Sequence, residues 1–259
     1  MDHIKSYLPL TAKFVNIVSG EIHFESELNS FSWCSWQGAE LITDILVYTN
    51  EGKLLYEWKW DVVVHGDEIE KSLWFYLKSR NDSGIVSNGL VIGSHDGRNG
   101  HWIYPIKKNI STATLIDGSK KQFKDLKKNY KDYQNVKLKN TIVTVDGSDV
   151  TWYQGGEGYT DTIKEGFIEN WVDKKEITKT TQSSISINTI MKDEQFDWLH
   201  LDVEGIDADL ILSLEYKPNV IIYESMNLTQ EETTRLKVWF DEFKYRTIVI
   251  GGNTMAMKN

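Results

Sequence analysis

The sequence has few of the residues that cross-link or break a chain. It holds one cysteine, Cys34, and three prolines in 259 residues. A single cysteine cannot form an internal disulfide, so nothing indicates an oxidising compartment. No apolar run approaches the roughly 20 residues that cross a bilayer, and residues 1–10 lack the apolar stretch of a signal peptide. We therefore expect a cytoplasmic protein that has no membrane partner.

Positive charge is also scarce. The net charge is −9, whereas binding a nucleic-acid backbone requires a basic surface. The one basic cluster, KKQFKDLKKNYK at residues 120–131, places Phe123, Leu126 and Tyr130 at helical spacing. This pattern is typical of the solvated face of an amphipathic helix. Nucleic acid is therefore not expected as a partner.

The N-terminal part of the chain has the pattern of β-structure. Residues 40–49 and 53–61 are apolar and aromatic runs that flank a short loop, NEG, typical of a hairpin. Half of the ten tryptophans lie before residue 80: Trp33, Trp36, Trp58, Trp60 and Trp74. Trp58 and Trp60 stand two apart and would share one face of a strand. These rings either pack the sheet against a neighbour, which includes a second copy in a homo-oligomer, or form a platform for a sugar-like ligand or a protein partner.

A helix is predicted to follow this region. Residues 67–80 carry acidic side chains in the first turn and basic ones in the last, which suits the helix dipole. We place the domain boundary after it, so that residues 1–84 form a small β-rich region with one helix. Residues 85–259 then form the second, larger domain.

The larger domain has an alternating strand and helix pattern, which predicts a parallel sheet with flanking helices. The expected strands are residues 90–93, 112–117, 136–143, 196–203 and 219–224, and the later helices are residues 207–214 and 230–243. The chain then ends in two runs around Gly251-Gly252-Asn253, the pattern of a β-hairpin. A parallel α/β sheet that closes with an antiparallel hairpin is the Rossmann-like fold of methyltransferases, and dinucleotide-binding dehydrogenases usually lack that hairpin.

Ligands of open α/β sheets bind at the carboxyl ends of the strands. After the first strand comes the glycine-rich turn GSHDG, in which Gly93 and Gly97 allow a sharp turn and a close approach to a ligand. The dinucleotide fingerprint would need a glycine at His95, and a phosphate loop would need a Gly-Lys-Ser/Thr sequence. Neither pattern is present.

A carboxylate ends the second strand. Asp117 follows Gly93 by 24 residues and is placed to accept hydrogen bonds from two ribose hydroxyls. The alternative is that Asp117 caps the next helix, a role that Ser119 can fill instead. Asn140 and Thr141, beside the third strand, are candidates for contacts with an adenine.

Acidic residues also follow the fourth and fifth strands. Asp202 and Glu204 come directly after a buried run, and Glu224 ends the next strand. Carboxylates at such ends are costly unless they are paired or functional. They can orient a substrate, act as a general base or bind a cation, although no metal is required. The alternative is N-capping of the following helix, where Asp207 and Asp209 already supply negative charge.

Three segments resemble the FkbM-type methyltransferase family. VIGSHDG at residues 91–97 resembles its D-x-G-A-N-x-G motif, and LIDGSKKQF at residues 115–123 resembles its acidic second-strand motif. DWLHLDVEG at residues 197–205 resembles D-x-x-K-x-D-V-E-G and is the most specific match. The resemblance covers the chain from about residue 85 onward. It implies a class I methyltransferase fold and S-adenosylmethionine as the cofactor.

The resemblance and the strand ends together give a set of candidate site residues. Those expected to bind the cofactor are Gly93, Ser94, His95, Asp96, Gly97, Asp117, Gly118, Ser119, Asn140, Thr141 and Asp202. Those expected to be catalytic are Asp202, Glu204 and Glu224.

The chain departs from the family motifs at three positions. His95 stands where the family has asparagine, and His200 stands where it has lysine. Val91 replaces an acidic residue that often steadies the methionine end of the cofactor in the family. Asp96, in the same turn, is a candidate substitute for that carboxylate.

The resemblance implies methylation of a hydroxyl on a sugar, a glycan or another small metabolite. An insert between the third and fourth strands would frame the acceptor, through Tyr159, Thr160 and Asp161 in a glycine-rich loop. The alternative for this loop is an ordinary surface hairpin. Two other functions are a different nucleotide-dependent enzyme and an inactive methyltransferase fold that binds a partner through its tryptophan-rich sheet.

Overall fold

The computed structural model describes the backbone of residues 10–16, 22–28, 42–49, 54–59, 68–155, 161–170 and 172–258. Side chains are described from residue 69 onward, without residues 156–160, 170, 171 and 259. The chain divides into two compact units, Met1–His65 and Gly66–Asn259. Each unit is described by itself.

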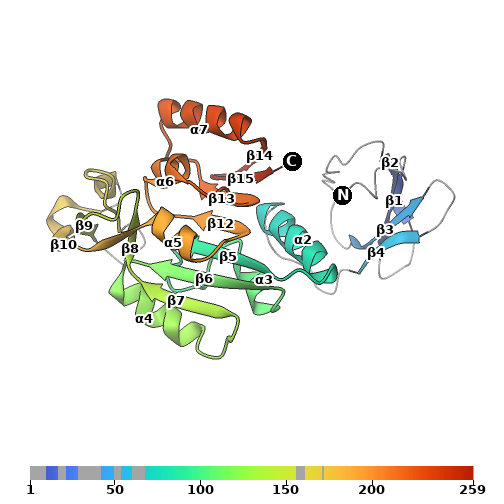
Figure 1. The fold of residues 1–259 in the computed structure, drawn as a ribbon, viewed down its shortest axis with the longest axis horizontal. Coiled ribbons are helices and arrows are strands. Elements are labelled where there is room, and N and C mark those ends of the chain that lie inside the picture. Colours follow the sequence, from blue (N-terminus) through green and yellow to red (C-terminus); the bar gives the residue numbers. More distant parts are fainter. Residues whose placement is uncertain are drawn as a thin grey trace. The chain divides into compact units, whose positions relative to one another are not determined.

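The first unit contains a four-stranded antiparallel sheet of order β2-β1-β3-β4 (Figure 1). The strands are β1 Leu10–Asn16, β2 Ile22–Leu28, β3 Ile42–Thr49 and β4 Leu54–Lys59. Strands β3 and β4 pair antiparallel, which confirms the predicted hairpin. The predicted roles of the tryptophan rings at positions 33, 36, 58 and 60 lie outside the described side chains.

The second unit contains a seven-stranded sheet of order β14-β15-β13-β12-β5-β6-β7 (Figure 1). Its strands are β5 Ser87–Ile92, β6 Ser111–Asp117, β7 Val136–Asn140, β12 Trp198–Leu201, β13 Val220–Glu224, β14 Tyr245–Ile250 and β15 Asn253–Lys258. Strand β15 runs antiparallel to both of its neighbours, and the other pairings are parallel. This arrangement confirms the Rossmann-like class I methyltransferase fold. The strand order reverses between β5 and β12, where ligands of such sheets bind.

Helices cover both faces of this sheet. Helices α2 Glu68–Asp82, α3 Ile103–Lys107 and α4 Lys120–Asn129 contribute to one apolar cluster, and α5 Ile187–Asp193, α6 Asp207–Ser213 and α7 Gln230–Glu242 contribute to the other. Side chains alternate between the clusters along each strand: Leu90 and Ile92 belong to one, and Val91 to the other. Burial on both faces explains why these strands are continuous apolar runs.

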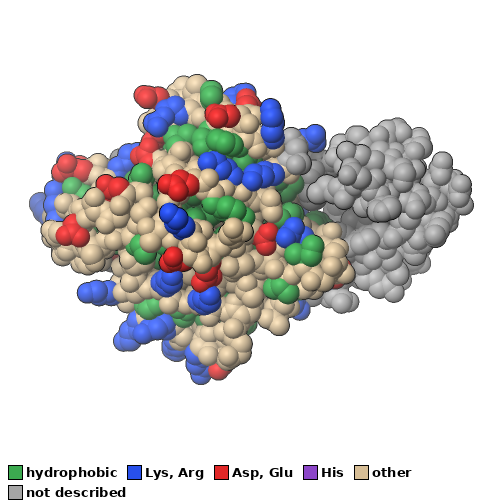
Figure 2. All heavy atoms as spheres, in the orientation of Figure 1, with side chains coloured by type: hydrophobic (Ala, Val, Ile, Leu, Met, Phe, Trp, Pro, Cys, Tyr) green, Lys and Arg blue, Asp and Glu red, His purple; other side chains and the backbone are tan. Residues whose placement is uncertain are grey.

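The basic segment forms helix α4, as its periodicity predicts. Leu126 is buried, and the lysines of the helix are exposed. Lys and Arg side chains gather over this helix on the surface (Figure 2). No helix in the described part of the chain is long and apolar enough to cross a membrane.

Three features differ from the expectations. The predicted strand 136–143 is split into β7 and β8 Ile142–Thr144. The amide of Thr141 still donates to the Asp117 carbonyl of β6 at 3.2 Å, and the chain leaves the main sheet after it. Strand β8 pairs instead with β11 Ser184–Ser186. Helix α2 lies in the second unit, since Leu73 packs in the same cluster as Val91, so the units divide at residue 65 and not at residue 84.

The remaining elements belong to the insert between β8 and β12. Strands β9 Val150–Gln154 and β10 Thr178–Gln182 pair antiparallel. Two short 3-10 helices lie between them, η1 Ile168–Asn170 and η2 Lys174–Glu176. Helix α5 then leads into β12.

Candidate active site

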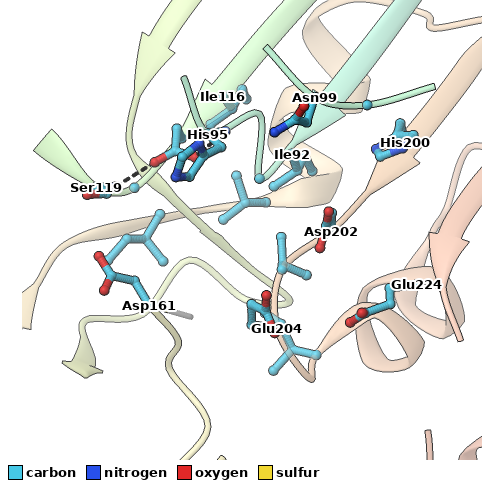
Figure 3. A pocket seen from close by; sticks show the side chains of 18 of the residues that line it. Ile92, His95, Asn99, Ile116, Ser119, Asp161, His200, Asp202, Glu204 and Glu224 are labelled. Atoms are coloured by element: carbon cyan, nitrogen blue, oxygen red, sulfur yellow. Dashed lines mark hydrogen bonds between the residues drawn. The ribbon is translucent and has the colours of Figure 1, made fainter. Parts of the chain in front are cut away.

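A cavity of about 630 Å³ opens at the carboxyl ends of β5, β6, β12 and β13 (Figure 3). Ten of the predicted site residues line it: Gly93, His95, Asp117, Gly118, Ser119, Thr141, Asp161, Asp202, Glu204 and Glu224. The cavity therefore lies where the strand order reverses, as the fold predicts. Tyr159 and Thr160 lie outside the described residues, so their acceptor contacts stay a prediction.

Gly93 allows two neighbouring strand ends to meet. Its φ is +80°, and a Cβ at this position would lie 1.7 Å from the backbone oxygen of Asp202. The amide of Asp202 also donates to the Ile92 carbonyl at 3.0 Å. A side chain at position 93 would push the turn after β5 away from the end of β12, so only glycine permits this approach.

Asp117 lines the cavity and accepts hydrogen bonds from two turns, the one after β5 and the one after β6. Its Oδ2 accepts from the amide of His95 at 2.7 Å, and its Oδ1 accepts from the amide of Ser119 at 2.8 Å. Burial raises the pKa of Asp117 to about 6, although both backbone hydrogen bonds lower it. Ser119 is the N-cap residue of α4, but its side chain makes no capping hydrogen bond.

Four predicted cofactor residues support these turns without lining the cavity: Ser94, Asp96, Gly97 and Asn140. Ser94 Oγ donates to the Ile116 carbonyl, and Asn140 Nδ2 donates to the Asp117 carbonyl. Asp96 pairs with His95 and Arg98. Since Asp96 faces these partners, it is poorly placed to replace the carboxylate that is missing at Val91.

Asp202, Glu204 and Glu224 converge on one side of the cavity (Figure 3). Asp202 is exposed toward the cavity, but protein atoms surround it on its other sides. This burial, and then the charges of Glu224 and Asp117, raise the pKa of Asp202 to about 7. Burial, and then the charges of Asp202 and Glu224, raise the pKa of Glu204 to about 8.

No basic side chain offsets this charge. The lining includes no Lys or Arg, and none of the ion pairs in the described part of the chain involves Asp202, Glu204 or Glu224. Over the same residues, no three His, Cys, Asp or Glu side chains group as metal ligands would. The arrangement favours an organic cation in the cavity, because such a ligand would neutralise carboxylates that are costly to ionise.

Asp207 adds a buried carboxyl behind this cluster. It is 1% exposed, and its Oδ1 has no hydrogen-bond partner among the described residues. Burial, and then the charges of Asp202 and Glu224, raise its pKa from 3.8 to about 8. A carboxyl with a raised folded-state pKa stabilises the fold while it is protonated, and this stability is lost as the pH rises through 8.

We therefore expect Asp207→Asn to stabilise the protein at high pH. The variant should gain about 1–3 kcal/mol more over the wild type at pH 9 than at pH 5.5, because an amide removes a charge that the folded wild type must bury as the pH rises toward 8. Thermal unfolding at both pH values measures this difference. Asp209→Asn, an exposed change on the same helix, is the control and should shift stability by less than about 0.5 kcal/mol at either pH. A gain that does not depend on pH would contradict the titration of Asp207.

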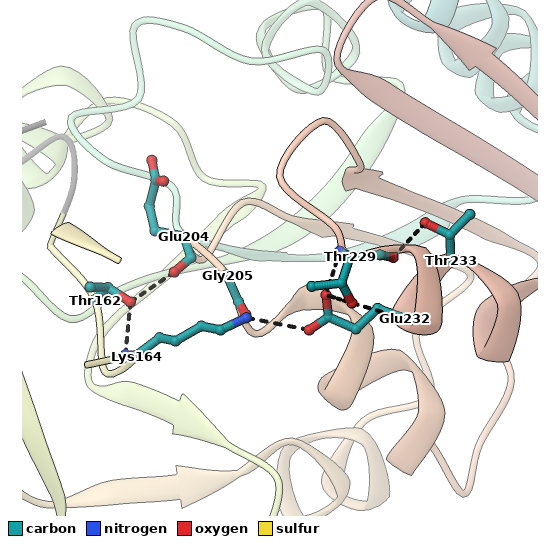
Figure 4. Close-up of polar contacts among 7 residues, drawn as sticks. All are labelled: Thr162, Lys164, Glu204, Gly205, Thr229, Glu232 and Thr233. Carbon is teal, nitrogen blue, oxygen red and sulfur yellow. Dashed lines mark hydrogen bonds and ion pairs between the residues drawn. The ribbon is translucent and has the colours of Figure 1, made fainter. Parts of the chain in front are cut away.

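The insert holds the loop that carries Glu204 (Figure 4). Thr162 is 0% exposed, and its Oγ1 donates to the Glu204 carbonyl at 2.7 Å. Lys164 Nζ donates to the Gly205 carbonyl at 3.0 Å and pairs with Glu232 at 3.3 Å. Glu204 has a φ of +55°, which is unfavourable for a residue with a side chain. These contacts therefore fix a strained residue whose carboxylate faces the cavity.

Asp161, from the same insert, lies on the same side of the cavity as Ser119 (Figure 3). Its charge raises the pKa of Asp117, and its carboxylate accepts from Gln154 and from the amide of Gly155. Asp161 was predicted to contact the acceptor substrate. It lies close enough to Asp117, the predicted ribose residue, for its charge to act there, and its contact with an acceptor stays a prediction.

Two groups of lining residues were not predicted as site residues. Trp152 and Ile142 form an apolar wall beside Gly118, where a Cβ would lie 2.9 Å from Ile142 and 3.3 Å from Trp152. His101 and His200 face each other, with 3.2 Å between Nδ1 of His101 and Nε2 of His200. His200 was noted only as a departure from a motif. The other residues carry no local signal, because the insert and the turn after β5 bring them to the site.

Comparisons with known proteins give one family match and several distant structural likenesses. Residues 91–247 match a family model described as the methyltransferase FkbM domain. No curated protein sequence matches the chain.

Three solved structures illustrate the structural likenesses. A precorrin-6y C5,15-methyltransferase from Geobacter metallireducens is 11% identical, with a TM-score of 0.41 over 77% of this chain and 91% of that one.

The other two give a TM-score of 0.38. A ribosomal protein L11 methylase from Lactobacillus delbrueckii is 12% identical over 75% of this chain and 81% of that one. An O-methyltransferase from Bacillus cereus, in complex with SAH, is 11% identical over 76% of this chain and 94% of that one.

Proposed function

Because the chain belongs to the FkbM methyltransferase family, we propose that it transfers a methyl group from S-adenosylmethionine to a hydroxyl on a sugar, a glycan or another small metabolite. Membership of the family implies S-adenosylmethionine as the cofactor. The observation that carries the proposal is the set of uncompensated carboxylates, Asp202, Glu204 and Glu224, on one side of the cavity. They suit both a cationic cofactor and the removal of a hydroxyl proton.

The cavity residues fit this cofactor. Asp117 keeps a carboxylate at the cavity wall while its backbone bonds hold it in place, so it can accept from ribose hydroxyls. The apolar wall of Ile142 and Trp152, next to Gly118, suits a planar base. The carboxylates of Asp202 and Glu224 would lie toward the positively charged sulfur.

The chain's own residues would then bind the cofactor, orient the acceptor and take up the proton of its hydroxyl. Bound S-adenosylmethionine supplies a methyl group that its sulfonium has already activated. Asp202 accepts the proton of the acceptor hydroxyl, and its pKa of about 7 is close to the pH at which a general base works best. The hydrogen bonds from Thr162 to the Glu204 carbonyl and from Lys164 to the Gly205 carbonyl hold the loop that follows Asp202. Because the methyl group is already activated, the protein raises the rate mainly by positioning the reactants.

Calorimetric titration with S-adenosylmethionine, S-adenosylhomocysteine and NAD tests the cofactor. We expect saturable binding of both adenosyl ligands and none of NAD. Transfer of a labelled methyl group from S-adenosylmethionine to a panel of sugars, glycans and phenols then tests the acceptor class. Binding of NAD alone would indicate a different nucleotide enzyme. Binding of none of the three would favour the inactive, partner-binding alternative.

A further inference from the structure

The charges of the cavity lining are strongly one-sided. Six lining residues carry carboxylates: Glu70, Asp117, Asp161, Asp202, Glu204 and Glu224. The lining side chains that can carry positive charge are His95, His101 and His200. A cationic or neutral part of a ligand therefore finds many partners, whereas an anionic group would be repelled nearly everywhere and has few donors available.

His200 holds an unused hydrogen-bonding atom at this cavity. It is 4% exposed, and its Nδ1 is buried without a hydrogen-bond partner among the described residues. Its Nε2 lies 3.2 Å from His101 Nδ1. A buried polar atom without a partner destabilises the fold, so it calls for an explanation such as a ligand.

The two nitrogens of His200 have linked roles. Burial, and then the charge of His101, lower the pKa of His200 to about 3, so the ring is neutral at physiological pH. A neutral imidazole has one N–H donor and one acceptor nitrogen. When His101 Nδ1 donates to His200 Nε2, the proton of His200 is on Nδ1, which makes this atom a donor in a residue that lines the cavity.

Resting on the proposed function, we propose that Nδ1 of His200 donates to the carboxylate of the amino-acid end of the bound adenosyl ligand, with His101 fixing the donor tautomer. The direction of the ligand supports this assignment. In Figure 3, Asp161 and Ser119 lie on one side of the cavity, and His200 and Asn99 lie on another. With the ribose at Asp117, the amino-acid end extends away from that side. The carboxylate there needs a donor, and Nδ1 of His200 has no other partner among the described residues.

Two variants of His200 separate this contact from a structural role. The amide of Asn takes the place of Nδ1, and the amide of Gln takes the place of Nε2. His200→Gln therefore keeps a partner for His101 and loses the donor to the cavity, whereas His200→Asn keeps that donor. Melting temperatures of both variants establish that they fold.

Calorimetry with two ligands isolates the carboxylate. S-Adenosylhomocysteine carries it, and decarboxylated S-adenosylhomocysteine keeps the ammonium, thioether and adenosine but lacks it. We expect His200→Gln to lower the affinity for S-adenosylhomocysteine by about tenfold to a hundredfold, the range for a hydrogen bond to a charged group, and to change that for the decarboxylated ligand less than about twofold. His200→Asn should lose less affinity than His200→Gln.

Three outcomes would overturn the assignment. One is an equal loss for both ligands, and another is a larger loss in His200→Asn than in His200→Gln, since each indicates a purely structural pair. The third is unchanged affinity in His200→Gln. If the wild type binds neither ligand, the proposed cofactor fails as well, whereas normal wild-type binding with an unaffected Gln variant rejects the histidine contact alone.

Discussion

Asp117→Asn is expected to lower the affinity for S-adenosylhomocysteine by about tenfold to a hundredfold. The amide replaces one carboxylate oxygen with a donor, which then faces the amide of either His95 or Ser119. Two N–H donors then face each other, so that hydrogen bond is lost. The ribose hydroxyls also lose one acceptor oxygen. A hydrogen bond to a charged group contributes about 1.5–3 kcal/mol, so the lost ribose contact alone corresponds to about tenfold to a hundredfold in affinity. Calorimetric titration at pH 8, where Asp117 is ionised, measures the effect.

The fold should survive this substitution. The pKa of Asp117 is raised to about 6, so the ionised carboxylate costs stability above that pH and an amide relieves the cost. That gain offsets part of the lost hydrogen bond. Asp125→Asn, an exposed change on α4, is the matched control and should leave binding unchanged. Retention of full affinity in Asp117→Asn would mean that the ribose binds elsewhere.

The sheet of the second unit was predictable because its signals are local. Strands buried on both faces are continuous apolar runs, and the closing hairpin has its own turn sequence. The break between β7 and β8 has no such local signal, because residues 136–143 read as a single run in the sequence. Helix α3 has only five residues, too few for an amphipathic period to be distinguished.

The site residues likewise include some that local sequence signals predict and others that only the fold brings together. Asp117, Asp202 and Glu224 were predictable, because the ends of parallel strands meet at one edge of the sheet. The pair of His101 and His200 was not, since 99 residues separate its members. Likewise, Asp161 was assigned to the acceptor from its loop sequence alone. Only the path of the insert brings its charge close enough to act on Asp117.

Asp202→Asn is expected to reduce turnover by about a hundredfold to ten-thousandfold, the usual contribution of a general base. Of the three candidate carboxylates, Asp202, Glu204 and Glu224, Asp202 fits the role of general base best. Its pKa is raised to about 7 and it is exposed toward the cavity, whereas Glu224 Oε2 accepts from Asn227 Nδ2 at 3.0 Å. The pKa of Glu204 is raised to about 8, so that group is mostly protonated at neutral pH. Initial rates of methyl transfer, with the acceptor found in the panel, measure turnover.

Binding and turnover should separate in this variant. S-Adenosylhomocysteine has no charge on its sulfur, so its affinity should change by less than about fivefold, while S-adenosylmethionine loses more because its sulfonium faces one carboxylate fewer. Asp161→Asn is the matched control, since it removes a lining carboxylate from the other side of the cavity. That change should affect binding more than turnover. Wild-type turnover in Asp202→Asn would move the base to Glu204 or Glu224, and the corresponding Gln variants would then show which of the two accepts the proton.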